Sequence, residues 1–170
     1  LRDHYASADL APVLDGFGEA TPERIDRTSR VFAMIENIDD NVGRLLATID
    51  HLGIAENTIV LFLTDNGPAG ARFVGPFRGT KGQVREGGIR TVSLWHQPGT
   101  LPPGESAVLS AHIDVLPTLL DLADLETPEG LRLEGISMAP WLRDPTRPVP
   151  SDRTLVIQAH RGDVPVRRHH

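Results

Sequence analysis

Cysteine is absent from this chain of 170 residues, which excludes disulfides and thiolate metal sites but leaves the cellular compartment open. Basic residues are also few, because 17 Lys and Arg stand against 23 Asp and Glu for a formal charge of -6. No broad basic surface for nucleic acid is therefore expected. No apolar run approaches the roughly 20 residues that a membrane-spanning helix needs. We expect neither nucleic acid as a partner nor a membrane span.

Several catalytic and targeting patterns are missing as well. No serine lies in a Gly-x-Ser-x-Gly elbow, and the Gly-Lys-Ser/Thr order of a nucleotide-binding loop does not occur. The chain starts at Leu1 without a methionine or a signal-like segment, so we expect any targeting peptide to lie upstream. No nucleophile constellation is visible, and a nucleotide site is rejected.

The length allows one ordinary domain with a real core. The expected elements are an irregular segment over 1–24, helices over 25–51, 114–123 and 137–142, strands over 58–64, 89–95 and 154–158, a long loop over 66–88 and a turn region over 97–104. Because helices and strands alternate, this order predicts an α/β fold with a mostly parallel sheet flanked by helices. No closing element follows the last strand, so we expect both ends to be cut and the sheet to be incomplete.

The helix predicted over 25–51 carries one apolar stripe and one acidic cluster. The stripe recurs at three- and four-residue steps and comprises Val31, Met34, Ile35, Ile38, Val42, Leu45, Leu46 and Ile49. The acidic cluster comprises Glu36, Asp39 and Asp40. A metal or acid/base role is conceivable for it, but we interpret it as a solvated face in which Asp40 pairs with Arg44 at i,i+4.

The most informative stretch is an apolar strand that ends in Asp65-Asn66-Gly67. A carboxylate and a carboxamide side by side are oxygen donors of the kind that calcium prefers. In open α/β sheets, ligands bind at this carboxyl end of the strands. The alternative is a plain turn, because Asn-Gly is a strong turn signal. A buried strand before the pair and no matching polar strand after it argue against a hairpin and favour ligand binding.

A glycine-rich segment carrying a lysine, Gly79-Thr80-Lys81-Gly82, follows about a dozen residues later. Lys81 is either an ordinary solvated lysine or a point charge that approaches an anion closely between its glycines. The oxygen donors Asp65 and Asn66 at the strand end, called the metal corner below, are followed by a loop that carries the positive charge of Lys81. This combination predicts a site for an oxyanion. Calcium usually takes six to eight oxygens, so Asp65 and Asn66 supply only part of a metal site.

Two histidines are candidates for a role in a site. His112 has a ligand-like spacing to Asp114, but Asp114 is better explained as the residue that starts a helix. His160 follows the last predicted strand, near Arg161 and Asp163. Its position at a strand end makes it a possible site residue.

Taken together, the order and spacing of these motifs resemble the sulfatase family of the alkaline-phosphatase-like superfamily. The segments that carry the resemblance are Met34 to Leu46, Asn57 to Gly67, Arg78 to Gly82, Glu86 to Arg90 and His112 to Leu120. The resemblance implies that Asp65 and Asn66 are calcium ligands and that Lys81 contacts the sulfate. It implies structural roles for Glu86, Gly87, Gly88, Arg90, Asp114 and Pro117.

The chain departs from the family pattern in one important way. Sulfatases of this kind use a formylglycine made within a Cys/Ser-x-Pro-x-Arg motif, but no cysteine is present and no serine begins such a motif. The N-terminal paired aspartates of the calcium site and the upstream Lys and His are also absent. We therefore expect residues 1–170 to be the C-terminal portion of a sulfatase catalytic domain, without its N-terminal part and its C-terminal subdomain.

The resemblance implies a sulfuric ester hydrolase acting on a small-molecule or glycan sulfate ester, with this portion inactive alone. Three alternatives stay open: a phosphonate or phosphodiester hydrolase of the same superfamily, a truncated non-catalytic remnant that binds calcium, and an unrelated calcium-binding module. The residues do not indicate the specific ester, the oligomeric state or the compartment. Export is an expectation from the family alone.

Overall fold

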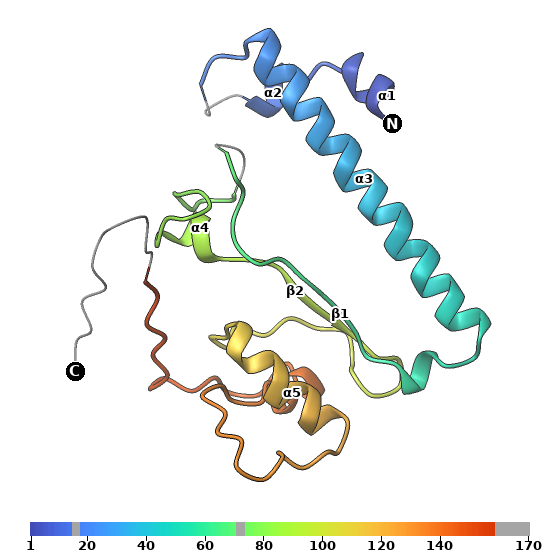
Figure 1. Ribbon diagram of the computed structural model, residues 1–170, viewed down its shortest axis with the longest axis vertical. Coiled ribbons are helices and arrows are strands. Elements are labelled where there is room, and N and C mark those ends of the chain that lie inside the picture. The colour runs from blue at the N-terminus through green and yellow to red at the C-terminus, as the bar shows by residue number, and fades with distance from the viewer. Residues whose placement is uncertain (15–17, 71–73, 159–170) are drawn as a thin grey trace. The chain divides into compact units, whose positions relative to one another are not determined.

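The computed structural model describes residues 1–14, 18–70 and 74–158 (Figure 1). These residues fall into two compact units, one drawn from 1–55 and 66–91 and the other from 56–65 and 92–158. The elements are α1 (Arg2–Ala6), α2 (Ala11–Leu14), α3 (Pro22–His51), η1 (Ala55–Asn57), β1 (Val60–Leu63), α4 (Glu86–Ile89), β2 (Ser93–His96), η2 (His112–Asp114), α5 (Val115–Leu122) and α6 (Ala139–Arg143). The candidate His160 lies outside the described residues.

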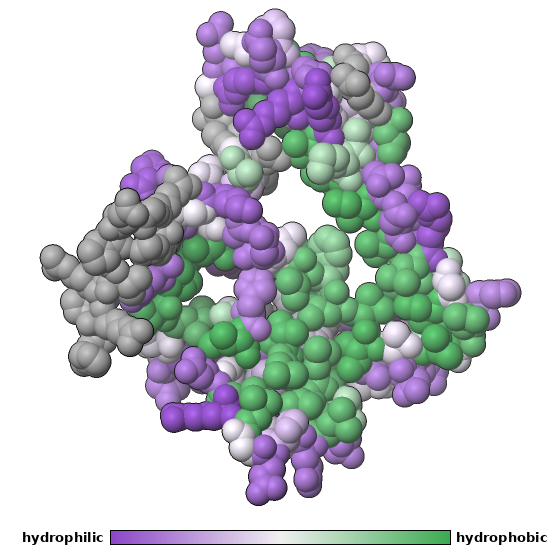
Figure 2. Space-filling model, viewed as in Figure 1, coloured by the Kyte–Doolittle hydropathy of each residue, from purple (hydrophilic) through white to green (hydrophobic). Residues whose placement is uncertain are grey.

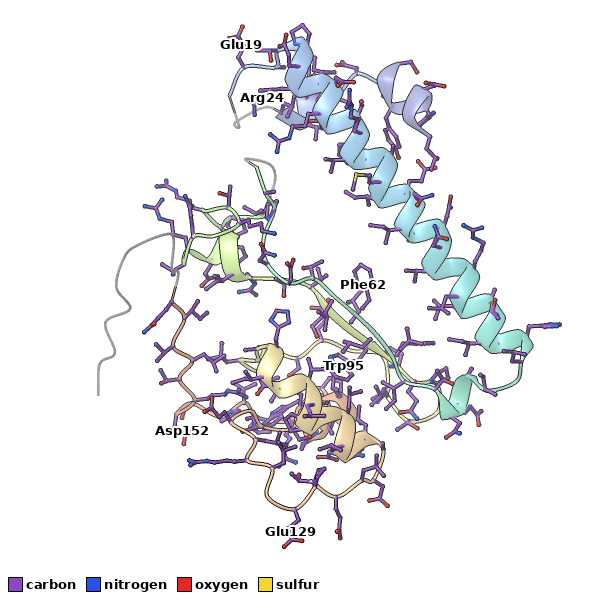
Figure 3. All side chains as sticks on the ribbon, in the orientation of Figure 1. Glu19, Arg24, Phe62, Trp95, Glu129 and Asp152 are labelled. Atoms are coloured by element: carbon purple, nitrogen blue, oxygen red, sulfur yellow. The ribbon has the colours of Figure 1, made fainter. Side chains whose placement is uncertain are left out.

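The first unit is built on α3, which confirms the helix predicted over 25–51 and begins three residues earlier. Thr21 caps its N-terminus by accepting a hydrogen bond from the Arg24 amide at 3.4 Å, and Pro22 occupies the first turn. The Arg24 guanidinium also donates to the Glu19 carbonyl at 2.8 Å, next to the start of the helix (Figure 3). Gly53, with a φ of +69°, follows the last turn.

The N-terminal segment was predicted to be irregular, and this prediction is wrong because α1 and α2 form there. The Tyr5 ring stacks on Phe32 of α3 with centroids 5.7 Å apart. A hydrogen bond with Glu36 raises the pKa of the Tyr5 hydroxyl. Leu10 and Leu14 are buried. Such short helices are stabilised by tertiary packing rather than by local propensity, which is why the local sequence did not predict them.

Two residues of the acidic cluster on α3, Asp39 and Asp40, are exposed as predicted, whereas Glu36 is half-buried and interacts with Tyr5. The predicted pair between Asp40 and Arg44 is wrong. Arg44 instead donates to Oδ1 of Asn41 at 2.7 Å, three residues back rather than four. Apolar side chains also follow α3 on the face seen in Figure 2. Part of the predicted stripe is exposed, namely Met34, Ile35, Ile38 and Leu45.

The second unit contains the two described strands, which pair antiparallel. Leu61 lies opposite Trp95 and Phe62 opposite Leu94, and the labelled Phe62 and Trp95 mark the two strands in Figure 3. A mostly parallel sheet is therefore not seen in the described part and stays a prediction. None of the described helices combines the length and the apolar character needed to cross a membrane.

Two of the predicted strands are displaced or missing. The strand predicted over 89–95 appears as β2 over Ser93–His96, because Glu86–Ile89 forms α4 instead. The strand predicted over 154–158 is wrong, since those residues form no strand. An extended, β-branched run becomes a strand only where a neighbouring strand supplies its hydrogen bonds.

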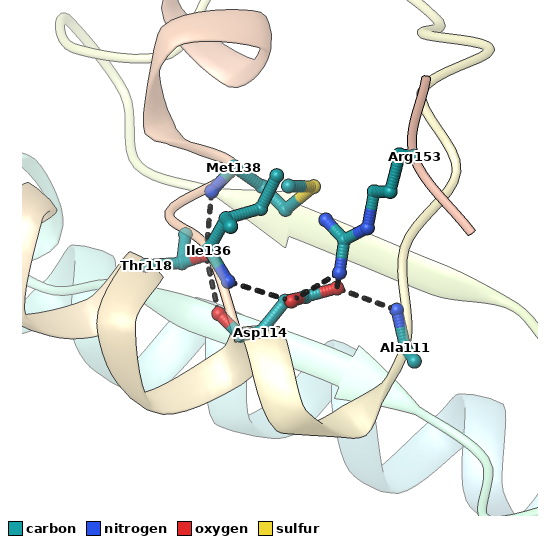
Figure 4. Close-up of polar contacts among 6 residues, drawn as sticks. All are labelled: Ala111, Asp114, Thr118, Ile136, Met138 and Arg153. Atoms are coloured by element: carbon teal, nitrogen blue, oxygen red, sulfur yellow. Dashed lines mark hydrogen bonds and ion pairs between the residues drawn. The ribbon is translucent and has the colours of Figure 1, made fainter. Parts of the chain in front are cut away.

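The second unit is held together by the buried carboxylate of Asp114, which is 2% exposed (Figure 4). It accepts hydrogen bonds from the amides of Ala111 at 2.7 Å and Ile136 at 2.9 Å. Nη2 of Arg153 lies 2.7 and 2.8 Å from its two oxygens. Asp114 starts α5, as predicted, but its side chain does not cap that helix and instead joins the nearby Ala111 to two distant residues, Ile136 and Arg153.

Thr118 extends this polar network through the same core. Its hydroxyl donates to the Asp114 carbonyl at 2.6 Å and accepts from the Met138 amide at 2.8 Å (Figure 4). Met138 directly precedes α6, which confirms the helix predicted over 137–142 to within two residues. Hydrogen bonds between buried polar groups favour one packing arrangement, so the contacts of Thr118 hold α6 against α5.

The carboxylate of Asp121 forms a second, more exposed cluster in this unit. Ser137 donates to Oδ2 at 2.6 Å, and Arg143 donates to Oδ1 at 2.8 Å. The Ser137 hydrogen bond and, after it, the Arg143 guanidinium hold the pKa of Asp121 below its usual value. The stability from this cluster is therefore present above the usual pKa of an aspartate and is lost as the pH falls through the lowered one.

We expect Ser137→Ala to raise the pKa of Asp121 toward its usual value, because the hydroxyl donor with the largest effect is removed. The acid-dependent loss of stability should then be smaller in the variant and should end at a higher pH than in the wild type. Carboxyl carbon shifts followed by NMR through an acid titration would measure this. An unchanged Asp121 titration would contradict the assignment of Ser137 as the main cause.

Candidate functional site

The strand end predicted as a metal corner lies at the carboxyl end of β1. Asp65 is separated from the last strand residue, Leu63, only by Thr64, and its side chain is exposed. Asn66, the next residue, is half-buried. The two oxygen-bearing side chains therefore stand where the strand pairing has ended and the chain changes direction.

The alternative of a tight hairpin turn at Asn66-Gly67 is excluded. Gly67 is not among the described glycines with positive φ, which a two-residue hairpin turn of the Asn-Gly type needs. β1 also pairs with β2, which begins only at Ser93. The Asn-Gly pair thus leads into the loop predicted over 66–88, whose described residues form no helix or strand before α4 at Glu86.

Gly67 is required for a different reason, which is close backbone packing. Its amide donates to the Gly88 carbonyl at 2.9 Å. A Cβ atom at position 67 would lie 2.0 Å from the Gly87 carbonyl oxygen. Only glycine allows this approach, and it pins the backbone directly after Asn66 onto the end of the loop.

We expect Gly67→Ala to destabilise this loop by about 1–3 kcal/mol, because the added methyl must displace backbone atoms. Gly43→Ala is the matched control, since a Cβ there meets nothing within 4 Å and the residue lies inside α3. The control should gain stability by about 0.5–1 kcal/mol, because alanine is the better helix former. Urea-induced unfolding would compare the two, and equal effects would refute the packing argument.

The loop returns Lys81 to the neighbourhood of the Asn66 corner. The Lys81 amide donates to the Pro68 carbonyl at 2.9 Å, two residues beyond Asn66. Gly79 supplies the turn with a φ of +112°, and the Gln83 amide donates to the Thr80 carbonyl at 3.0 Å. The structure therefore brings together the sequence-predicted lysine and the segment that follows the predicted metal ligands.

The segment after Lys81 has a structural role, as the resemblance implied. Gly87 and Gly88 are buried, and the Gly87 amide donates to the Arg78 carbonyl at 2.9 Å. A Cβ on Gly88 would lie 2.4 Å from the Gln83 carbonyl oxygen. Arg90 forms an exposed pair with Glu86 at 3.3 Å. The glycines make the loop compact around Lys81.

The loop is a local concentration of positive charge in an acidic chain. Its basic residues are Arg78, Lys81, Arg85 and Arg90, and Glu86 is the one acid between positions 78 and 90. Lys81 and Arg85 are exposed, and the Arg90 guanidinium lies 4.6 Å from the centre of the Phe77 ring. Such a field attracts an anion, so the loop suits a sulfate or phosphate group.

The donor chemistry of Asp65 and Asn66 fits calcium, which binds carboxylate and carboxamide oxygens. The described residues contain no group of three or more His, Cys, Asp or Glu that is placed to hold a metal ion. These two side chains alone would supply only part of the oxygen ligands that a calcium ion takes.

His112 lies next to this strand end through a contact that the sequence did not predict. Its Nε2 lies 3.0 Å from the Thr64 carbonyl oxygen, although the two residues are 48 positions apart. The sequence singled out His112 only for its spacing to Asp114, and that pairing has no ligand role because the Asp114 carboxylate is buried among other donors. No local signal links His112 to Thr64.

Comparison with known proteins identifies the family to which this chain belongs. The sulfatase family description matches residues 3–125. An uncharacterized sulfatase of Escherichia coli, YdeN, is 37% identical over 119 residues, which cover 66% of this chain and 21% of that protein. Human arylsulfatase A is 36% identical over 130 residues, which cover 74% of this chain and 25% of that enzyme.

Solved structures agree. The PsFucS1 sulfatase from Pseudoalteromonas matches with a TM-score of 0.56 and 32% identity over 72% of this chain and 24% of that one. Ps i-CgsB, solved in complex with k-i-k-neocarrahexaose, matches with a TM-score of 0.60 and 26% identity over 79% of this chain and 29% of that one. The chain thus spans between a fifth and a third of these relatives. It belongs to the sulfatase family.

Proposed function

We propose that this chain is the C-terminal portion of the catalytic domain of a longer sulfuric ester hydrolase, in which it supplies half of a calcium site and a sulfate-binding lysine. The observation that carries the proposal is the closed loop from Asn66 to Gly88. It joins oxygen donors at a strand end to a lysine through the bonds from Gly67 to Gly88 and from Lys81 to Pro68. The match to the family over residues 3–125 covers all of it.

Asp65 and Asn66 would hold calcium through their side-chain oxygens, and the ion, when bound, polarises the oxygens of the sulfate ester. Lys81 would place its ammonium against the negative charge that these oxygens carry. The compact glycine packing around it lets the backbone and the ammonium approach the anion without intervening side chains. This division of roles orients the sulfate group and stabilises its charge.

The nucleophile must come from another part of the protein. A formylglycine arises from a Cys or Ser followed by x-Pro-x-Arg, and this sequence contains neither form of that motif. No residue of this chain therefore fits the reacting group. We propose that an upstream segment provides it and that these residues alone do not turn over substrate.

A sulfated glycan is the substrate class that we favour. Ps i-CgsB was solved with a carrageenan-type oligosaccharide, and another relative is named N-acetylgalactosamine-6-sulfatase. They support testing glycan sulfate esters beside small aryl sulfates.

The experiment is an assay of the full-length protein that carries this sequence. We expect sulfate release from aryl sulfates or sulfated oligosaccharides, and we expect calcium removal with a chelator to stop it. Phosphonate and phosphodiester analogues serve as the comparison, because the same oxygen donors and lysine suit phosphate. Preferred turnover of those analogues would replace the sulfatase assignment with a phosphonate or phosphodiester hydrolase. Activity of the isolated 170-residue chain would overturn its proposed dependence on an upstream nucleophile.

A further inference from the structure

We propose that His112 is a positioning residue for the calcium corner, acting on Asp65 through the main chain of Thr64. The proposal rests on the proposed function of Asp65 as a metal ligand. The observation that supports the role of His112 is the distance of 3.0 Å between its Nε2 atom and the Thr64 carbonyl oxygen. Both residues belong to the second unit, as does Asp65.

The orientation of the Thr64 carbonyl group helps to set the direction of the Asp65 side chain. The β1–β2 pairing ends with Leu63 opposite Ser93, so the peptide group between Thr64 and Asp65 lies beyond the last paired residues. That peptide group contains the Thr64 carbonyl and the Asp65 nitrogen in one rigid plane. A hydrogen bond to the carbonyl oxygen therefore restricts the rotation of the plane, and with it the direction in which the Asp65 side chain leaves the backbone.

His112 is well placed to hold that carbonyl because its own backbone is anchored on both sides. It opens the short helix η2, which ends at the buried Asp114. The Ala111 amide, directly before His112, donates to Oδ2 of Asp114 at 2.7 Å. The buried Arg153 pair secures the same carboxylate (Figure 4). The network around Asp114 thus gives the imidazole a rigid base.

The contact also sets the chemistry of the ring. A carbonyl oxygen only accepts hydrogen bonds, so Nε2 of His112 must carry a proton. The neutral ring is then the Nε2–H tautomer, with Nδ1 left as an acceptor. This tautomer is a signature that can be observed independently of activity.

A hydrogen bond that merely joins two segments would affect stability without affecting metal binding. The test therefore measures calcium affinity by isothermal titration, together with kcat for a sulfate ester and the melting temperature in chelator. The full-length protein is used, with His112→Leu to remove the donor and His112→Gln to restore one at a similar reach. His51→Leu is the matched control, because His51 is an exposed histidine in the last turn of α3.

We expect His112→Leu to weaken calcium binding about tenfold, as removal of groups that orient metal ligands does. His112→Gln should recover most of that loss, and His51→Leu should bind calcium as the wild type does. Nitrogen-15 NMR of the wild-type imidazole should show the Nε2–H tautomer of His112.

Three results would overturn the proposal. Calcium affinity within about twofold of wild type in His112→Leu, with binding lost in Asp65→Ala, would refute the role of His112 and leave the proposed function standing. Intact calcium binding in Asp65→Ala would overturn both. If His112→Leu does not fold, the NMR signature decides, and an Nδ1–H tautomer would exclude the hydrogen bond on which the role depends.

Discussion

Asp65→Ala is expected to abolish calcium-dependent hydrolysis of sulfate esters by the full-length protein, lowering kcat/KM by about a thousandfold or more. The change removes the carboxylate that follows β1 and leaves the carboxamide of Asn66 beside it. A metal-bound transition state loses several kcal/mol of charge stabilisation when its ion is lost or misplaced. Steady-state kinetics across a calcium titration would measure the loss.

Asp39→Ala is the matched control for this experiment. Asp39 is also an exposed aspartate, but it lies on the solvated face of α3. We expect its removal to leave both turnover and calcium affinity unchanged. If Asp65→Ala retains wild-type turnover, or if both variants lose activity alike, the assignment of the metal corner fails.

Local patterns in the sequence predicted α3, α5 and α6 but missed α1, α2 and α4. The apolar periodicity and the Thr21-Pro22 start define α3 without reference to the rest of the protein. A strand depends on its partner, so the pairing direction of β1 and the outcome of residues 154–158 were not contained in their own residues. The helix α1 was missed for the same reason, since it depends on Tyr5 packing against Phe32.

The candidate site shows the same division. Residue type, neighbouring glycines and order along the chain were enough to predict Asp65, Asn66 and Lys81 as site residues. The structure shows that the loop brings the Lys81 amide to the Pro68 carbonyl. The contacts that orient the corner are long-range. His112 reaches Thr64 over 48 positions and Arg153 reaches Asp114 over 39. No pattern of a single sequence encodes such pairs.

The largest loss of stability is expected from Asp114→Ala, at about 3–5 kcal/mol in the free energy of unfolding. The substitution leaves the Arg153 guanidinium, whose side chain is 11% exposed, without its counterion. Nη1 of Arg153 is already buried with no hydrogen-bond partner among the described residues. The amides of Ala111 and Ile136 lose their acceptor as well.

Two further variants test whether the loss of stability comes from the buried position of the Asp114–Arg153 pair. Arg30→Gln breaks a 2.7 Å ion pair with Asp26 in which the Arg30 side chain is 57% exposed and the Asp26 side chain 48% exposed. It should lower the free energy of unfolding by at most about 1 kcal/mol. Asp114→Ala combined with Arg153→Met should be more stable than Asp114→Ala alone, because the unpaired buried charge is removed with its partner. Urea-induced unfolding of all three would decide. A cost for Asp114→Ala no larger than that of Arg30→Gln would show that the network around Asp114 does not hold the second unit together.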